Sequence, residues 1–259
     1  GDWIRRYDYE TTNNRLRNTS FPGDPPDLSS VSPRYLYDEH GSMTKMPHLL
    51  QMDWDFKDEL QRVDLGGGGV AYYVYDAAGQ RVRKVIERQT GARQKERIYL
   101  GGFEIYREYN GDGSTVTLER ETLHVMDDRQ RIALVDTKTI NVGDGINLPT
   151  NLLTPILRYQ ISNHLGSTCL ELDAAGAVIS YEEYHPYGTT AYHATDSSME
   201  VSLKRYRYTG KERDEETGLY YHGARYYAGW LGRWTSTDPA TGQLMNLYRG
   251  FGNNPINRV

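Results

Sequence analysis

Asp238, an acidic residue directly before a proline, is the side chain in this sequence that we single out for chemistry, and Arg233 and Arg249 flank it. An Asp-Pro pair is by itself typical of a turn. A lone carboxylate cannot serve both as the base that activates water and as the acid that protonates a leaving group. The two arginines could orient the carboxylate charge, or they could form ordinary structural or surface ion pairs, which contribute little.

The other reactive side chains form no recognisable site. Glu182 and Glu183 are adjacent on an expected strand, so they should point to opposite faces and not act as a catalytic pair. The seven histidines show no metal-ligand spacing, and a single cysteine, Cys169, excludes an internal disulfide. The glycine run at 66–69 precedes strand-forming residues, so a turn is favoured over a phosphate loop. The sequence therefore predicts no metal and no other cofactor.

The composition indicates a folded, β-rich chain. Its 259 residues include 22 tyrosines but only 4 phenylalanines and 4 tryptophans. Tyrosine favours strands and joins an apolar ring to a polar hydroxyl. The net charge is −5 and no basic stripe is present, so nucleic acid is not an expected partner. No apolar run approaches the roughly 18 residues that a membrane span requires, so none is predicted.

A loose repeat runs along the chain, with Tyr-Asp or a similar pair followed by a turn glycine. Its copies include residues 37–41, 75–79 and 172–176. Aspartate favours the start of a turn and glycine permits positive φ, while the flanking runs alternate apolar and polar residues. A single hairpin cannot bury its own face, so neighbouring hairpins must stack into a longer sheet. We therefore predict a mainly all-β fold, with at most two short helices, over residues 10–17 and 212–219.

Four segments near the C-terminus resemble the RHS-repeat-associated core domain of RHS/YD-repeat proteins. They are YRYTGKERDEETGLYYHGARYY at 206–227, GRWTSTDP at 232–239, NLYR at 246–249 and NNPIN at 253–257, in the family's order. Residues 99–106, 163–167 and 184–188 are similar to other recurrent family segments, and the Tyr-Asp turns resemble its namesake repeats. The resemblance covers most of the chain and is strongest from residue 158 onward.

The resemblance implies a YD-repeat β-shell segment over residues 1–157 and an RHS-associated core over residues 158–259. Family members stack hairpins into a curved, spiralling sheet that forms a hollow shell, and a small irregular core region plugs one end. The expected partners are the protein's own C-terminal toxin domain, carried as cargo, and a toxin-complex or secretion component that delivers it. We expect a protein made in the cytoplasm and secreted, or delivered by a bacterial secretion system.

In many bacterial members the core region is also an aspartyl autoprotease that cuts the cargo free. The resemblance assigns one catalytic carboxylate to Asp238, paired with a second Asp-Pro expected beyond Val259. Two carboxylates a few ångströms apart share a proton, so one can act as base and the other as acid. With only the first of them, the chain as given is expected to be unable to cut itself.

Two other functions stay open at this point. A carbohydrate- or cell-surface-binding YD-repeat module would use aromatic faces to bind a glycan. An autonomous hydrolase acting on other proteins would need a complete carboxylate pair, which this chain lacks. Sugar binding would favour the first alternative. Proteolysis of added protein that depends on Asp238 would favour the second.

Overall fold

The computed structural model describes residues 4–128, 130–142, 154–195, 204–238 and 246–258. One antiparallel sheet dominates the fold, and its strands pair in sequence order from β5 to β16. These strands are β5 (Gln51–Trp54), β6 (Leu60–Asp64), β7 (Val70–Tyr75), β8 (Arg81–Glu87), β9 (Arg93–Tyr99), β10 (Phe103–Tyr109), β11 (Val116–Met126), β12 (Arg131–Asn141), β13 (Ile156–Ser162), β14 (Thr168–Leu172), β15 (Val178–Tyr184) and β16 (Thr190–Thr195).

Smaller sheets complete the structure. Two are hairpins, β1 (Tyr7–Tyr9) with β2 (Leu16–Thr19) and β3 (Leu36–Tyr37) with β4 (Met43–Lys45). A four-stranded meander follows near the C-terminus, with β17 (Glu212–Arg213), β18 (Tyr220–Tyr221), β19 (Tyr226–Ala228) and β20 (Arg233–Trp234). The helices among the described residues are short 3-10 turns: η1 (Leu28–Ser30), η2 (Gly66–Gly68), η4 (Tyr208–Gly210) and η5 (Gly250–Asn253).

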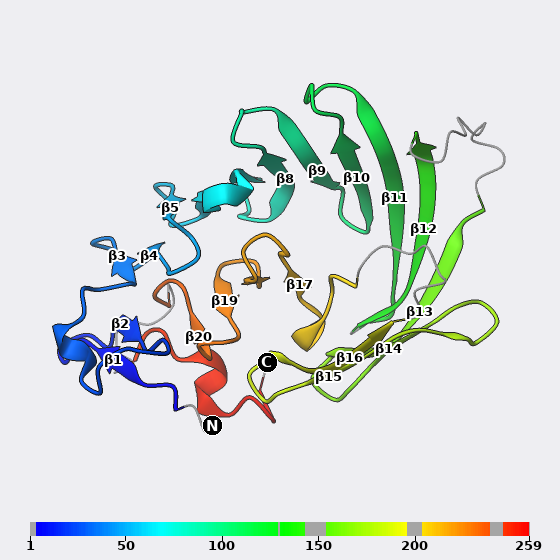
Figure 1. The fold of residues 1–259 in the computed structure, drawn as a ribbon. Coiled ribbons are helices and arrows are strands. Elements are labelled where there is room, and N and C mark those ends of the chain that lie inside the picture. Colours follow the sequence, from blue (N-terminus) through cyan, green and yellow to red (C-terminus); the bar gives the residue numbers. More distant parts are fainter. Residues whose placement is uncertain (1–3, 129, 143–153, 196–203, 239–245, 259) are drawn as a thin grey trace.

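The large sheet bends into an open curve, and the C-terminal meander lies inside it (Figure 1). We call the side of the sheet that faces the meander the concave face and the opposite side the convex face. Side chains alternate between the two faces along each strand. On β15 Glu182 is fully buried on the concave side while Glu183 is exposed, which confirms that these carboxylates point apart.

Asp-x-x-Gly turns close several of the hairpins. The Asp76 carboxylate accepts hydrogen bonds from the backbone amides two and four residues later, each at 2.9 Å, and Gly79 has a φ of +77°. Asp173 makes the same pair of bonds, and Gly176 has a φ of +82°. Side chains rarely adopt this backbone conformation, so glycine is favoured at the corner. The predicted turn chemistry of the repeat is therefore confirmed at both positions.

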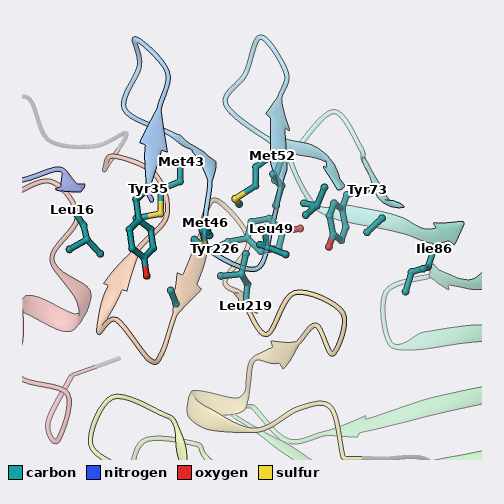
Figure 2. Close-up of a cluster of buried hydrophobic side chains, with 14 residues drawn as sticks. Leu16, Tyr35, Met43, Met46, Leu49, Met52, Tyr73, Ile86, Leu219 and Tyr226 are labelled. Carbon is teal, nitrogen blue, oxygen red and sulfur yellow. The ribbon is translucent and has the colours of Figure 1, made fainter. Parts of the chain in front are cut away.

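The main apolar core lies where the early strands meet the meander (Figure 2). It is rich in methionine and tyrosine, which fits the scarcity of phenylalanine. Its buried members are Leu16, Tyr35, Met43, Met46, Leu49, Met52, Leu60, Val63, Ala71, Tyr73, Ile86, Leu219, Tyr226 and Ala228. A second, aromatic cluster holds the far side of the meander and comprises Tyr208, Tyr220, Tyr227, Trp234 and Phe251.

The mainly all-β fold with a curved sheet is confirmed, whereas the two predicted helices are wrong. Residues 10–17 form a turn and the start of β2, and residues 212–219 form β17 and a turn. Left-handed backbone at Asn14 (φ 58°) and Gly218 (φ 74°) interrupts any helix in these segments. None of the helices among the described residues has the length and apolar character of a membrane span.

The division at residues 157 and 158 stays a prediction. Strands β12 and β13 pair through Ala133 with Tyr159 and Asp136 with Ile156. The large sheet therefore runs without a break from the predicted shell segment into the predicted core region. Residues 204–238 and 246–258 then leave the sheet and lie on its concave side (Figure 1).

Candidate functional site

Asp238 lies just beyond β20 on a segment that is tied to two neighbouring strands. Thr235 donates its backbone N–H to the carbonyl of Tyr226 at 3.0 Å and accepts from the amide of Met43 at 2.8 Å. The hydroxyl of Thr237 donates to the carbonyl of His40 at 3.2 Å. Thr235 is fully buried, so the chain that carries Asp238 is held in place up to the residue before it.

Arg225 is the cation that the fold brings to Asp238. Its Nη2 lies 3.1 Å from Oδ2 of Asp238, and the two side chains are 17% and 25% exposed. The guanidinium carbon sits 4.2 Å from the centre of the Trp234 ring. Burial lowers the pKa of Arg225, and the charge of Asp238 acts in the opposite direction. The ring of Trp234 thus packs against the guanidinium group of Arg225, and the ion pair remains partly exposed to solvent.

His222 completes the inner wall of this site. Its ring centre is 5.0 Å from that of Trp234, in an edge-to-face arrangement. Burial, together with the charges of Lys211 and Arg225, lowers the pKa of His222 to about 3. The imidazole is therefore neutral at neutral pH and packs as an aromatic ring beside the Asp238–Arg225 pair.

The two arginines that flank Asp238 in sequence lie elsewhere. Arg233 is 5% exposed, and its guanidinium lies against the rings of Tyr9 and Tyr248. Arg249 is exposed, and the backbones of the two arginines form an isolated β-bridge. A supporting role of Arg233 or Arg249 toward Asp238 remains a prediction. Sequence reasoning missed Arg225 because only the pairing of β19 with β20 shows that it meets Asp238.

This geometry fixes one carboxylate and one guanidinium beside an aromatic wall. Such a pair can orient the carboxylate toward a substrate, but it lacks the second acid that amide hydrolysis requires. No group of three or more histidine, cysteine, aspartate or glutamate side chains among the described residues could hold a metal ion. A catalytic role of Asp238 therefore stays a prediction.

A network of buried ion pairs fixes the meander to the concave face. Arg81 of β8 is 2.7 Å from both Glu212 and Asp214, and Lys84 is also 2.7 Å from Asp214. Glu104 of β10 accepts from Arg205 at 2.6 Å. The charges of these cations outweigh the effect of burial and keep the pKa of Glu104 and of Glu212 below its usual range.

A second group of ion pairs lies further along the sheet. Arg158 is 3.1 Å from Asp136 and 2.7 Å from Glu171, and all three side chains are buried. Glu182 pairs with Lys204 at 2.9 Å and with Arg207. The segment from Lys204 onward is therefore attached to β15 before it reaches β17.

The proteins that resemble this chain include subunits of toxin complexes. Toxin subunit YenC1 of Yersinia entomophaga is 34% identical over 98% of the chain. The crystal structure of TcdB2-TccC3 superposes with a TM-score of 0.80 and 33% identity over 98% of the chain. The chain is homologous to Tc toxin subunits. The structure of TcdB2-TccC3 without its hypervariable C-terminal region gives the same TM-score and identity.

The chain spans 28% of the length of YenC1 and 12% of the TcdB2-TccC3 chain. No family model matches it. Its large antiparallel sheet has the fold of the corresponding part of the TcdB2-TccC3 shell. The assignment of residues 158–259 to the RHS-associated core in particular stays a prediction.

Proposed function

We propose that this chain is the part of a bacterial toxin shell that closes over a C-terminal toxin domain and releases it by aspartyl autoproteolysis in the longer parent protein. The observation that carries the proposal is Asp238, anchored by the Thr235 and Thr237 contacts and paired with Arg225 on the meander inside the curved sheet. Homology to Tc toxin subunits supports the structural part of this role.

The concave face suits a wall that holds cargo. The cavity between β8 to β11 and the meander is lined mainly by charged and polar side chains, such as Glu108, Arg120 and Glu215. A wall of this kind offers few apolar groups to an unfolded polypeptide, which would otherwise bind to it through the hydrophobic effect. We therefore propose that the face encloses the toxin domain without adhering strongly to it.

Cleavage would need the second carboxylate that we predict beyond Val259. One carboxylate would take a proton from water, whose oxygen attacks the carbonyl carbon of the scissile amide. The other, protonated, would pass its proton to the amide nitrogen as the C–N bond breaks. Arg225 would act as a positioning residue, because its ion pair holds Asp238 in a single orientation.

The test extends the chain through the next Asp-Pro and into the segment that follows. Products are weighed by denaturing mass spectrometry for the unsubstituted protein, Asp238→Asn, Arg225→Gln and Arg225→Lys. We expect one cut in the unsubstituted protein, none in Asp238→Asn, and slower cutting in Arg225→Gln that Arg225→Lys restores in part. Cutting in Asp238→Asn would remove Asp238 from the mechanism, and an intact unsubstituted protein would reject autoproteolysis.

A toxin-complex or secretion component would deliver such a shell, and we propose that the protein is made in the cytoplasm before delivery.

The second candidate function is glycan binding on the convex face. Tyr181 and Tyr192 are 37% and 56% exposed there, with ring centres 6.2 Å apart. Exposed aromatic rings suit sugar faces, and a glycan array would detect this activity. Loss of the signal in Tyr192→Ala would assign it to this pair.

A further inference from the structure

A cavity of about 630 Å³ lies apart from Asp238, between the first hairpin and the loops that surround the meander. Strand β1 contributes Tyr7 and Tyr9, and the loop before β16 contributes His185 and Tyr187. The turn between β19 and β20 supplies Trp230. Tyr248 adds a further ring, so aromatic rings from four parts of the chain cover much of the wall.

The charged side chains that line this cavity all have the same sign. They are Arg5, Arg233 and Arg249, and no aspartate or glutamate occurs among the described lining residues. The chain as a whole carries a net charge of −5, so a local cluster of three guanidinium groups without an acid departs from its general composition. Clustered cations repel one another and attract anions into a partly enclosed space.

Arg233 lies deepest in this cluster. It is only 5% exposed, and its Nη2 donates to the carbonyl of Asn14 at 2.8 Å. Tyr9 and Tyr248 place their ring centres 5.3 and 4.9 Å from its guanidinium carbon. Its Nε is buried and has no hydrogen-bond partner among the described residues. A buried cation is stabilised best by an anion, and among the described residues tyrosine side chains and the carbonyl of Asn14 take that place.

The other two arginines extend the cluster toward its opening. Arg5 donates to the carbonyl of Trp230 at 3.3 Å, and its Nε is also buried without a partner among the described residues. Arg249 is exposed, and its backbone pairs with that of Arg233. Among the described residues, Arg5 and Arg233 thus each keep a buried Nε donor without a partner, and Arg249 adds a third guanidinium group at the edge of the cavity.

We propose that this cavity binds an acidic segment of polypeptide. A carboxylate accepts two parallel hydrogen bonds from a guanidinium group, so an Asp or Glu side chain matches Arg233 and Arg249. The tyrosine rings and Trp230 would contact the apolar part of the same segment. This site is separate from the Asp238–Arg225 pair and does not depend on autoproteolysis.

The test uses the chain as described here and an acetylated, amidated Glu-Tyr-Glu peptide. Isothermal titration compares it with Gln-Tyr-Gln and with inorganic phosphate. We expect the acidic peptide to bind at least about tenfold more tightly than the neutral one, because the neutral peptide lacks charge-assisted hydrogen bonds. Added salt should weaken the binding of the acidic peptide but not that of the neutral peptide, since salt screens exposed charges.

Variants locate the site. Arg249→Gln changes an exposed side chain and should weaken acidic-peptide binding several-fold while the thermal midpoint stays unchanged. Arg233→Lys keeps the charge but loses the two-pronged donor, and it should weaken binding further. Lys45→Gln removes an exposed cation that does not line the cavity and should have no effect.

Three results would overturn the proposal. Equal affinity for the acidic and neutral peptides would show that the guanidinium groups do not select the ligand. Unchanged binding in Arg249→Gln would place the peptide elsewhere. Phosphate binding as tight as that of the acidic peptide would show that the site binds simple anions and that the aromatic wall does not contribute to binding.

Discussion

The C-terminal meander rests on two supports of opposite chemistry. On one side Leu219 and Tyr226 pack into the methionine-rich core beside β4 to β8. On the other side Glu212 and Asp214 are bound by Arg81 and Lys84 on the concave face. Both contacts are buried, but the first stabilises by removing apolar surface from water and the second must offset the desolvation of its charges.

This difference assigns separate tasks to the two supports. Apolar packing contributes most of the free energy, because removal of apolar surface from water is the dominant favourable term in folding. Buried ion pairs contribute little net stability when intact and are costly when one member is lost. They also work at fixed distances, so they define where the meander lies on the sheet. We infer that the ionic side sets the position of the Asp238 segment and that the apolar side keeps it attached.

The largest expected effect is the loss of one carboxylate from the ionic side. Asp214→Ala leaves Arg81 and Lys84 buried without their shared partner. We expect a loss of about 3–5 kcal/mol in the free energy of unfolding, measured by urea denaturation. The exposed Asp128 provides a control, because Asp128→Ala should cost far less. If Asp214→Ala proved as mild as the control, the ionic support would have no structural role.

Substitution of a buried side chain on the apolar side should lower the free energy of unfolding somewhat less. Leu219 is fully buried, and Leu219→Ala removes its contacts and leaves a cavity. The expected loss is about 2–4 kcal/mol by the same measurement, depending on how far the core collapses. Leu50 is 53% exposed, so Leu50→Ala serves as the matched control with little change. A Leu219→Ala protein of unchanged stability would show that this core does not hold the meander.

Acid should weaken the ionic contacts of the concave face first, and these include the pairs of Glu182 with Lys204 and Arg207 as well as the Arg81 and Lys84 group. Burial raises the pKa of Glu182, but Arg207 and Lys204 outweigh it and lower the pKa to about 2. Since this value is below that of the unfolded chain, Glu182 stabilises the fold above about pH 4.5, and the contribution disappears as the pH falls toward 2. Glu104 and Glu212 shift in the same direction, whereas burial raises the pKa of Glu216.

Thermal unfolding of the unsubstituted protein and Glu182→Gln between pH 6 and pH 2 measures this contribution. The curve of melting temperature against pH should be flatter in the variant within that window. Parallel curves would mean that Glu182 has the same proton affinity in the folded and unfolded chain. The ionic support would then owe nothing to this residue.

Local chemistry could be predicted from the sequence, whereas long-range pairing could not. The Asp76 and Asp173 turns follow from aspartate and glycine at fixed spacing, and the opposite faces of Glu182 and Glu183 follow from the strand period. The predicted helix at 212–219 was wrong because Glu212 and Asp214 form ion pairs with Arg81 of the large sheet, a long-range contact that the local sequence does not show.

The candidate site shows the same limit. Asp238 could be singled out by resemblance, but Arg225 is recognisable only once the register of β19 and β20 places it opposite. Arg233 looked like a neighbour of Asp238 in sequence, yet its side chain points into the arginine-lined cavity. Sequence proximity does not show on which side of a short strand a side chain will lie.

The most direct test of the proposed function is native mass spectrometry of the longer parent protein, which carries the whole shell, measured beside its denaturing spectrum. The proposal predicts two masses under denaturing conditions and their sum under native conditions, because the cut segment stays enclosed by the shell. Asp238→Asn should give the full-length mass under both conditions. Two separate masses under native conditions would contradict enclosure, and a single full-length mass for the unsubstituted protein under denaturing conditions would contradict cleavage.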